Sequence, residues 1–143
     1  LGVVQMSDHR TFVVADIPGI IEGAHHGKGL GLQFLRHVER TRVLAFLVPL
    51  DDPDPQAAFD GLRREIEAYS LALFAKPFVV VLSKRDLLPE AGSLPELDAP
   101  DARAVMAMSA VAGTGLDELK RTFWRLIEEA KAIEVPEEDH ALE

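Results

Sequence analysis

The chain has 143 residues, of which 48% are hydrophobic and 27% charged, so it holds enough apolar material for one domain-sized core. Its formal net charge of −9 disfavours a broad electrostatic surface for nucleic acid. It has no cysteine, which excludes disulfide frameworks and cysteine-ligated zinc, and no apolar run approaches the roughly 18 residues of a membrane span. We therefore expect a monomeric cytoplasmic domain that binds neither a membrane nor DNA.

The first elements are predicted to form an antiparallel hairpin. Residues 2–6 and 11–15 are apolar runs of strand length, and the turn-forming residues 7–9 separate them. A glycine-rich segment follows as far as Gly31, and apolar residues then recur at helical spacing over residues 30–41. The spacing predicts a helix there.

Strands and helices alternate through the remaining sequence. Residues 43–50 and 78–82 are continuous apolar runs, typical of strands covered on both faces, and residues 104–108 are a shorter one. One helix is predicted from Asp54-Pro55 to the residues before Pro77, and another over residues 116–130. Helix capping and a solvated loop account for Asp51 and its acidic neighbours. The pattern predicts an α/β fold with a largely parallel sheet over residues 1–131, followed by an acidic, disordered tail over residues 132–143.

Polar motifs follow three of the predicted strands, at the end of the sheet where ligands bind in parallel α/β folds. Each motif alone has an ordinary explanation as a turn or a solvated helix start. Their residues are the candidate binding residues of the chain. They are Asp16, Ile17, Pro18 and Gly19 after the second strand, Ser83, Lys84, Arg85 and Asp86 after the fourth, and Ser109, Ala110 and Val111 after the fifth.

Taken together and in this order, the three motifs resemble the D-x-x-G, N-K-x-D and S-A-x motifs of the Ras-like P-loop GTPases. The stretch 13–41, with Gly29-Leu30-Gly31 at its centre, is similar to the Obg family of bacterial ribosome-assembly GTPases. The resemblance implies a Ras-like G domain that binds GTP or GDP with Mg²⁺, hydrolyses GTP and acts on the large ribosomal subunit. A flavodoxin-like small-molecule domain shares the architecture but does not predict Asp86 and Ser109 at neighbouring strand ends.

The resemblance also implies roles for individual residues. Asp16 would hold Mg²⁺ through the water shell of the ion, and the N–H of Gly19 would approach the γ-phosphate. Loss of that contact on hydrolysis would release residues 16–31 and so report the nucleotide state. At the base, Asp86 would accept hydrogen bonds from guanine, Lys84 would lay its aliphatic stem along the ring, and the turn at Ser109 would present N–H groups to the O6 atom.

The sequence departs from the family motifs at two positions. Ser83 stands where the family has Asn, which is expected to weaken guanine binding by about 1 kcal/mol if one hydrogen bond is lost. Ile20 stands where Ras-like enzymes have a glutamine that orients water, and Obg-type GTPases also carry an apolar residue there. Slow intrinsic hydrolysis is the expected result unless a partner supplies the missing group.

The phosphate-binding string G-x-x-x-x-G-K-[ST] does not occur in this sequence; Gly27-Lys28 is followed by Gly29. In the family the first strand, the P-loop and the first helix precede the position of Leu1, so we expect an incomplete G domain. The absent strand would lie between strands 11–15 and 43–50, which must either close together or leave an empty slot. The chain alone is then expected to be inactive, although its intact parent is a GTPase. The alternative is a module without a P-loop that only binds other proteins.

Overall fold

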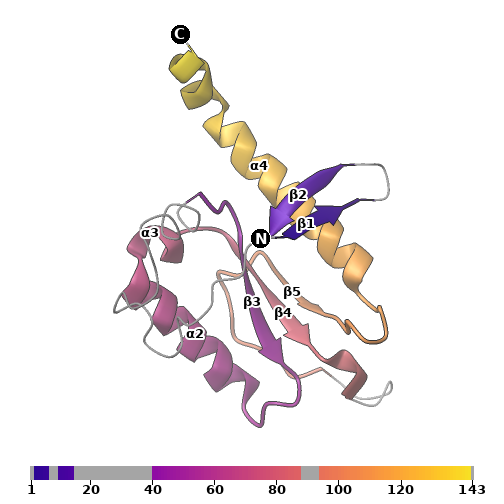
Figure 1. The fold of residues 1–143 in the computed structure, drawn as a ribbon. Helices are drawn as coiled ribbons and strands as arrows, with labels where there is room; N and C mark the ends of the chain where they lie inside the picture. The colour runs from indigo at the N-terminus through magenta and orange to yellow at the C-terminus, as the bar shows by residue number, and fades with distance from the viewer. Residues whose placement is uncertain (1, 7–9, 15–39, 88–93, 143) are drawn as a thin grey trace.

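The computed structural model describes residues 2–6, 10–14, 40–87 and 94–142, with residues 2–3 and 134–142 as backbone only (Figure 1). In these ranges no helix is long and apolar enough to cross a membrane. The elements, in chain order, are β1 (Gly2–Gln5), β2 (Thr11–Val14), β3 (Leu44–Pro49), α2 (Pro55–Tyr69), α3 (Leu71–Phe74), β4 (Phe78–Ser83), the 3₁₀ turn η2 (Arg85–Leu87), β5 (Ala104–Ala107) and α4 (Leu116–Leu142).

The described strands form two separate sheets. β1 and β2 pair antiparallel, with Val3 opposite Val13, which confirms the predicted hairpin. β3, β4 and β5 pair parallel in that order, with Phe46 opposite Val80 and Val80 opposite Val105. The α/β class and the mainly parallel sheet are therefore confirmed.

The central strand β4 separates two apolar layers. Phe78, Val80 and Leu82 face the side covered by α2 and α3, whereas Val79 and Val81 face the side of α4 (Figure 1). All five are at most 4% exposed, because β4 has a strand neighbour on each edge and helices on each face. This is the burial that a continuous apolar run predicts.

The α2 side is built around aromatic rings. Phe46 meets both Phe59 and Phe78 edge to face, with ring centroids 5.9 and 5.4 Å apart. The guanidinium of Arg63 lies 4.2 Å from the Phe78 ring centroid and 4.0 Å from that of Phe74. Desolvation by burial lowers the pKa of Arg63. Cation–π contacts of Arg63 therefore hold α2 on the sheet together with apolar packing.

Two element predictions are corrected by the structure. The single helix expected before Pro77 is divided at Ser70, whose extended backbone (φ −159°) ends α2 and whose hydroxyl accepts from the Leu73 N–H to begin α3. β3 is not covered on both faces: its residues alternate between buried and exposed, and Leu47 is 54% exposed. The side of β3 opposite α2 has no covering element among the described residues, because α4 packs on Val79, Val81 and Met106 instead.

The backbone of α4 is helical as far as Leu142, through the segment 132–143 for which a disordered tail was expected. The alanines and glutamates of this segment favour a helix, whereas Pro136 in its middle has no N–H to donate and disfavours one. The division of the chain at residue 131 stays a prediction.

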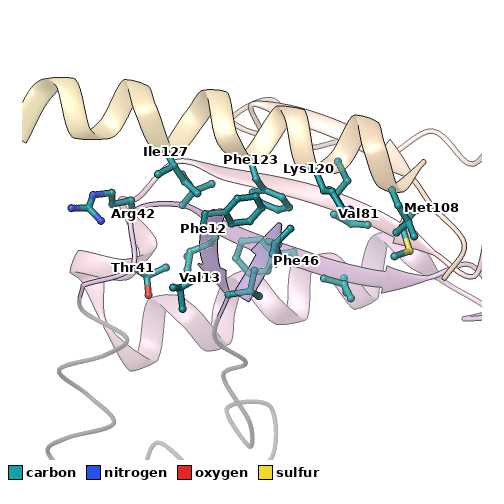
Figure 2. Close-up of a pocket in the computed structure, with 18 of the residues that line it drawn as sticks. Phe12, Val13, Thr41, Arg42, Phe46, Val81, Met108, Lys120, Phe123 and Ile127 are labelled. Atoms are coloured by element: carbon teal, nitrogen blue, oxygen red, sulfur yellow. The ribbon is translucent and has the colours of Figure 1, made fainter. Parts of the chain in front are cut away.

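A groove separates the hairpin from the three-stranded sheet. β2 contacts α4, with the rings of Phe12 and Phe123 6.3 Å apart, and the Arg10 guanidinium lies 4.7 Å from the Trp124 ring centroid. No described residue pairs β2 with β3, and a cavity of about 940 Å³ lies between them (Figure 2). Figure 2 shows Phe123 and Ile127 pointing from α4 toward Phe12 across this groove. Strands 11–15 and 43–50 were expected either to close together or to leave a slot between them. Among the described residues β2 and β3 do not pair, and the groove is that slot.

Candidate functional site

The site begins where β3, β4 and β5 end together on one edge of the sheet. The Leu50 N–H donates to the Ser83 carbonyl (2.9 Å), and the Met108 N–H donates to the Leu82 carbonyl (2.9 Å). The Arg85 N–H then donates to the Met108 carbonyl (3.0 Å). These bonds extend the strand pairing by one step, so the segments that leave the three strands start from fixed positions.

Ser109 and Asp86 join two of the polar motifs. The Ser109 hydroxyl donates to Asp86 Oδ1 over 2.7 Å, and Ser109 has no exposed surface. The same hydroxyl oxygen accepts from the Ala112 N–H at 3.0 Å. Asp86 itself is exposed, so its carboxylate is oriented by a buried partner while remaining accessible to a ligand.

The loop after β5 is closed by backbone bonds around Ser109. The Gly113 N–H donates to the Ser109 carbonyl (2.8 Å), and the Ser109 N–H donates to the Thr114 carbonyl (3.0 Å). Gly113 and Gly115 have φ values of 75° and 78°, which favour glycine. A Cβ on Gly115 would lie 2.4 Å from the Ala107 carbonyl oxygen, so the loop folds tightly against the end of β5. Val111, at its tip, is 90% exposed.

Lys84 has an uncommon backbone conformation, with φ at 60°. Its carbonyl accepts from the Leu87 N–H at 3.0 Å, which forms the turn of η2. Its ammonium pairs with Asp51 Oδ2 at 3.1 Å, and the two side chains are 53% and 46% exposed. The lysine therefore extends from the end of β4 back across the end of β3.

The structure brings seven of the eleven candidate residues to this edge of the sheet. Ser83 is half-buried and offers its carbonyl to Leu50, and Arg85 begins η2. The seven are Ser83, Lys84, Arg85 and Asp86 from the fourth strand end, and Ser109, Ala110 and Val111 from the fifth. Asp16, Ile17, Pro18 and Gly19 lie outside the described residues.

Asp16, the residue predicted to hold Mg²⁺, lies outside the described part of the chain. Among the residues that are described, no three His, Cys, Asp or Glu side chains cluster as a metal site would require. The gathered side chains supply one carboxylate, one ammonium, one guanidinium and two hydroxyl groups, and backbone N–H and carbonyl groups lie between them.

Asp51 also lies at this edge of the sheet, although helix capping and a solvated loop were expected to account for it and its acidic neighbours. Asp54 does cap α2, accepting from the Ala57 N–H at 3.1 Å, and Asp52 accepts from the Asp54 N–H at 2.9 Å. Asp51 alone turns toward the polar motifs. The signal in the sequence was the position of Asp51 just after the apolar run 43–50, because the other candidate residues also follow predicted strands.

Similarity to known proteins extends over most of the chain. The family of 50S ribosome-binding GTPases matches residues 1–84. Over 134 residues the chain is 52% identical to the GTPase Obg of Chloroherpeton thalassium, covering 94% of this chain and 40% of that protein. It is 50% identical to the GTPase Obg of Chlorobium chlorochromatii over 93% of the chain and 39% of the relative. It is 47% identical to the GTPase Obg of Salinibacter ruber, over 94% of this chain and 41% of that protein.

The chain thus spans about 40% of the length of these relatives, while nearly all of it aligns with them. The strand-end motifs, the parallel order β3-β4-β5 and the N-terminal hairpin agree with the resemblance drawn from the sequence. The chain therefore belongs to the family of 50S ribosome-binding GTPases, and its similarity to the Obg-type members of that family is confirmed.

Proposed function

We propose that the protein binds GTP and GDP and reads the guanine base with the motifs at the ends of β4 and β5. The observation that carries the proposal is the hydrogen bond from the buried Ser109 hydroxyl to Asp86 Oδ1. It joins two motifs 23 residues apart in sequence at one edge of the sheet. A carboxylate held in this way is prepared for a ligand that donates two parallel hydrogen bonds.

Guanine has the complementary edge. Its N1–H and exocyclic N2 amine donate side by side, and Asp86 accepts from both. Adenine lacks this pair of donors, so it would cover the carboxylate without replacing the hydrogen bonds that Asp86 makes to water, which costs about 1–3 kcal/mol. The aliphatic stem of Lys84 covers one face of the base, and the Ala110 N–H approaches the O6 atom, since the Ser109 N–H already donates to the Thr114 carbonyl.

Phosphate binding and hydrolysis are assigned to the D-x-x-G segment and to a P-loop that this sequence does not contain. Asp16 would hold Mg²⁺ through water, and the ion supplies neutralisation of the β- and γ-phosphate oxygens. Hydrolysis is in-line attack of water on the γ-phosphate, assisted by positioning and by electrostatic stabilisation. With Ile20 in place of a water-orienting glutamine, the intrinsic rate is slow.

We place the action of this switch in assembly of the large ribosomal subunit. The support is the description of the matching family as 50S ribosome-binding GTPases, together with relatives that carry the name GTPase Obg. The change between GTP and GDP would be transmitted by residues 16–31.

The test uses the complete product of the gene that encodes this chain, with a fluorescent guanine nucleotide and Mg²⁺. We expect saturable binding that GDP and GTP displace and ATP does not, and loss of that binding in the Asp86→Ala variant. Phosphate release would report hydrolysis, and co-sedimentation with 50S subunits in GTP but not in GDP would report the ribosomal role. Equal displacement by ATP and GTP would contradict guanine recognition.

The isolated 143-residue chain gives a second measurement. It is expected to bind the fluorescent nucleotide weakly or not at all, because no P-loop donates N–H groups to the phosphates. Submicromolar affinity of this chain would contradict the assignment of phosphate binding to a P-loop.

A further inference from the structure

Lys84 is held in a conformation that a lysine rarely adopts. Its φ of 60° lies in the left-handed region, which is strained for an L residue relative to the right-handed one. Among the described residues it is the one non-glycine with positive φ. A glycine would take this conformation without strain, so the lysine side chain supplies something that glycine would not.

The partner of that side chain is Asp51, the second residue beyond β3. Lys84 Nζ lies 3.1 Å from Asp51 Oδ2, with both side chains about half exposed. The strand ends fix the distance, since Pro49 pairs with Ser83 in the β3–β4 register and the Leu50 N–H donates to the Ser83 carbonyl at 2.9 Å. The pair therefore joins two rigid strand ends.

Stability alone does not account for this ion pair. An exposed ion pair in water stabilises a fold only slightly, by no more than the strained backbone conformation of Lys84 costs. The pair does, however, restrict a side chain with four rotatable bonds before any ligand arrives. Ordering such a side chain during binding costs conformational entropy and weakens affinity, and a protein that orders it in advance avoids that loss.

We propose that Asp51 is a positioning residue of the guanine site, which acts by holding Lys84 extended so that its stem forms one wall of the base pocket. The inference rests on the proposed function, because the ligand is a guanine nucleotide. Asp51 does not touch the base. Because its carboxylate holds only the ammonium, the methylene groups of the lysine are left to cover the ring.

The test is a double-mutant cycle in the complete gene product, with the dissociation constant of a fluorescent GDP analogue as the readout. Asp51→Asn removes the charge with little change of shape, and Lys84→Met keeps an apolar stem without the ammonium. We expect Asp51→Asn to weaken binding about two- to tenfold, the range that ordering one long side chain corresponds to. In the Lys84→Met background the same substitution should change affinity less than 1.5-fold. Asp51→Glu, which keeps the carboxylate, should recover part of the loss.

A matched control is Glu129→Gln. It breaks the exposed pair between Arg103 and Glu129, at 3.6 Å with both side chains 52% exposed, and changes the net charge by the same amount. Glu129→Gln should bind the nucleotide as the unmodified protein does. Thermal unfolding of all variants shows whether an altered affinity reflects altered folding.

The outcomes separate the inference from the function on which it rests. If the unmodified protein binds guanine nucleotide and Asp51→Asn binds equally well or more tightly, the positioning role is overturned and guanine binding stands. If Asp51→Asn weakens binding equally in both backgrounds, Asp51 acts by a route other than Lys84 and the inference is again overturned. A protein that does not bind guanine nucleotide overturns both.

Discussion

Ser109, which has no exposed surface, donates its hydroxyl to Asp86 Oδ1 over 2.7 Å and accepts from the Ala112 N–H with the same oxygen. One side-chain atom thus connects the end of β4 with the loop after β5. Because both partners of the hydroxyl have defined positions, its removal affects folding and the candidate site together.

Ser109→Ala is expected to lower the free energy of unfolding by about 1–3 kcal/mol, since the Ala112 N–H and the Asp86 carboxylate both lose their hydrogen bond to the buried hydroxyl. It should also weaken guanine nucleotide binding, because the Asp86 carboxylate loses its orientation. Chemical denaturation and nucleotide titration measure the two effects. The control is Ser70→Ala, which removes the cap of α3 and costs about 1 kcal/mol while leaving affinity unchanged. An unchanged affinity in Ser109→Ala would show that this bond has no part in binding.

Asp86→Asn tests the hydrogen-bonding pattern of the base site. An amide presents one acceptor and one donor where the carboxylate presents two acceptors. We therefore expect at least tenfold weaker binding of GDP and a gain for xanthosine diphosphate, whose base carries a carbonyl in place of the N2 amine. Competition titrations with the two diphosphates measure the ratio. Parallel loss of both ligands would argue against direct contact of Asp86 with the base.

Ser83→Asn restores the residue that the family motif has at this position. If the shorter hydroxyl has cost one hydrogen bond, the asparagine should tighten guanine binding by about 1 kcal/mol, which is roughly fivefold. Ser83→Ala serves as the comparison and should differ little from the unmodified protein, since the backbone carbonyl of Ser83 is the atom that binds Leu50. Weaker binding in Ser83→Asn would show that the loop has adapted to serine.

Gly115 and Gly113 form a matched pair for testing the loop after β5. Both have positive φ, but a Cβ on Gly113 meets nothing within 4 Å, whereas one on Gly115 would lie 2.4 Å from the Ala107 carbonyl oxygen. Gly113→Ala should cost about 1 kcal/mol of unfolding free energy, the strain of the backbone conformation alone. Gly115→Ala adds the displacement of a backbone atom and should cost about 2–5 kcal/mol. Similar values for the two variants, from thermal or urea unfolding, would contradict this packing.

The sequence predicted the elements whose signal is local. The apolar runs that became β3, β4 and β5 are short and continuous, and Asp54-Pro55 marks the start of α2 with a capping side chain that the structure contains. The division of α2 from α3 was missed because Leu73 continues the apolar period of α2 past Ser70. A serine in that position is equally common on the polar face of an uninterrupted helix.

Features that depend on distant neighbours were not predictable in the same way. Leu47 on β3 is exposed because no element among the described residues covers that face of the strand. Whether a helix covers a strand depends on residues far away in sequence, so the neighbours of Leu47 carry no signal of it. The Asp51–Lys84 pair joins residues 33 positions apart and depends on the β3–β4 register. The approach of Asp86 to Ser109 was inferred from a family resemblance, and the strand order β3-β4-β5 supplies the physical reason for it.

The contact between Arg10 and Trp124 has a practical consequence. Trp124 is the single tryptophan of the chain, and the Arg10 guanidinium lies 4.7 Å from its ring centroid. Its emission spectrum therefore reports on the β-hairpin, through Arg10, which is 114 positions away in sequence. Any event that lifts the hairpin from α4, whether a ligand in the groove or partial melting, alters the surroundings of the indole. The protein thus contains an intrinsic fluorophore that follows hairpin docking without a chemical label.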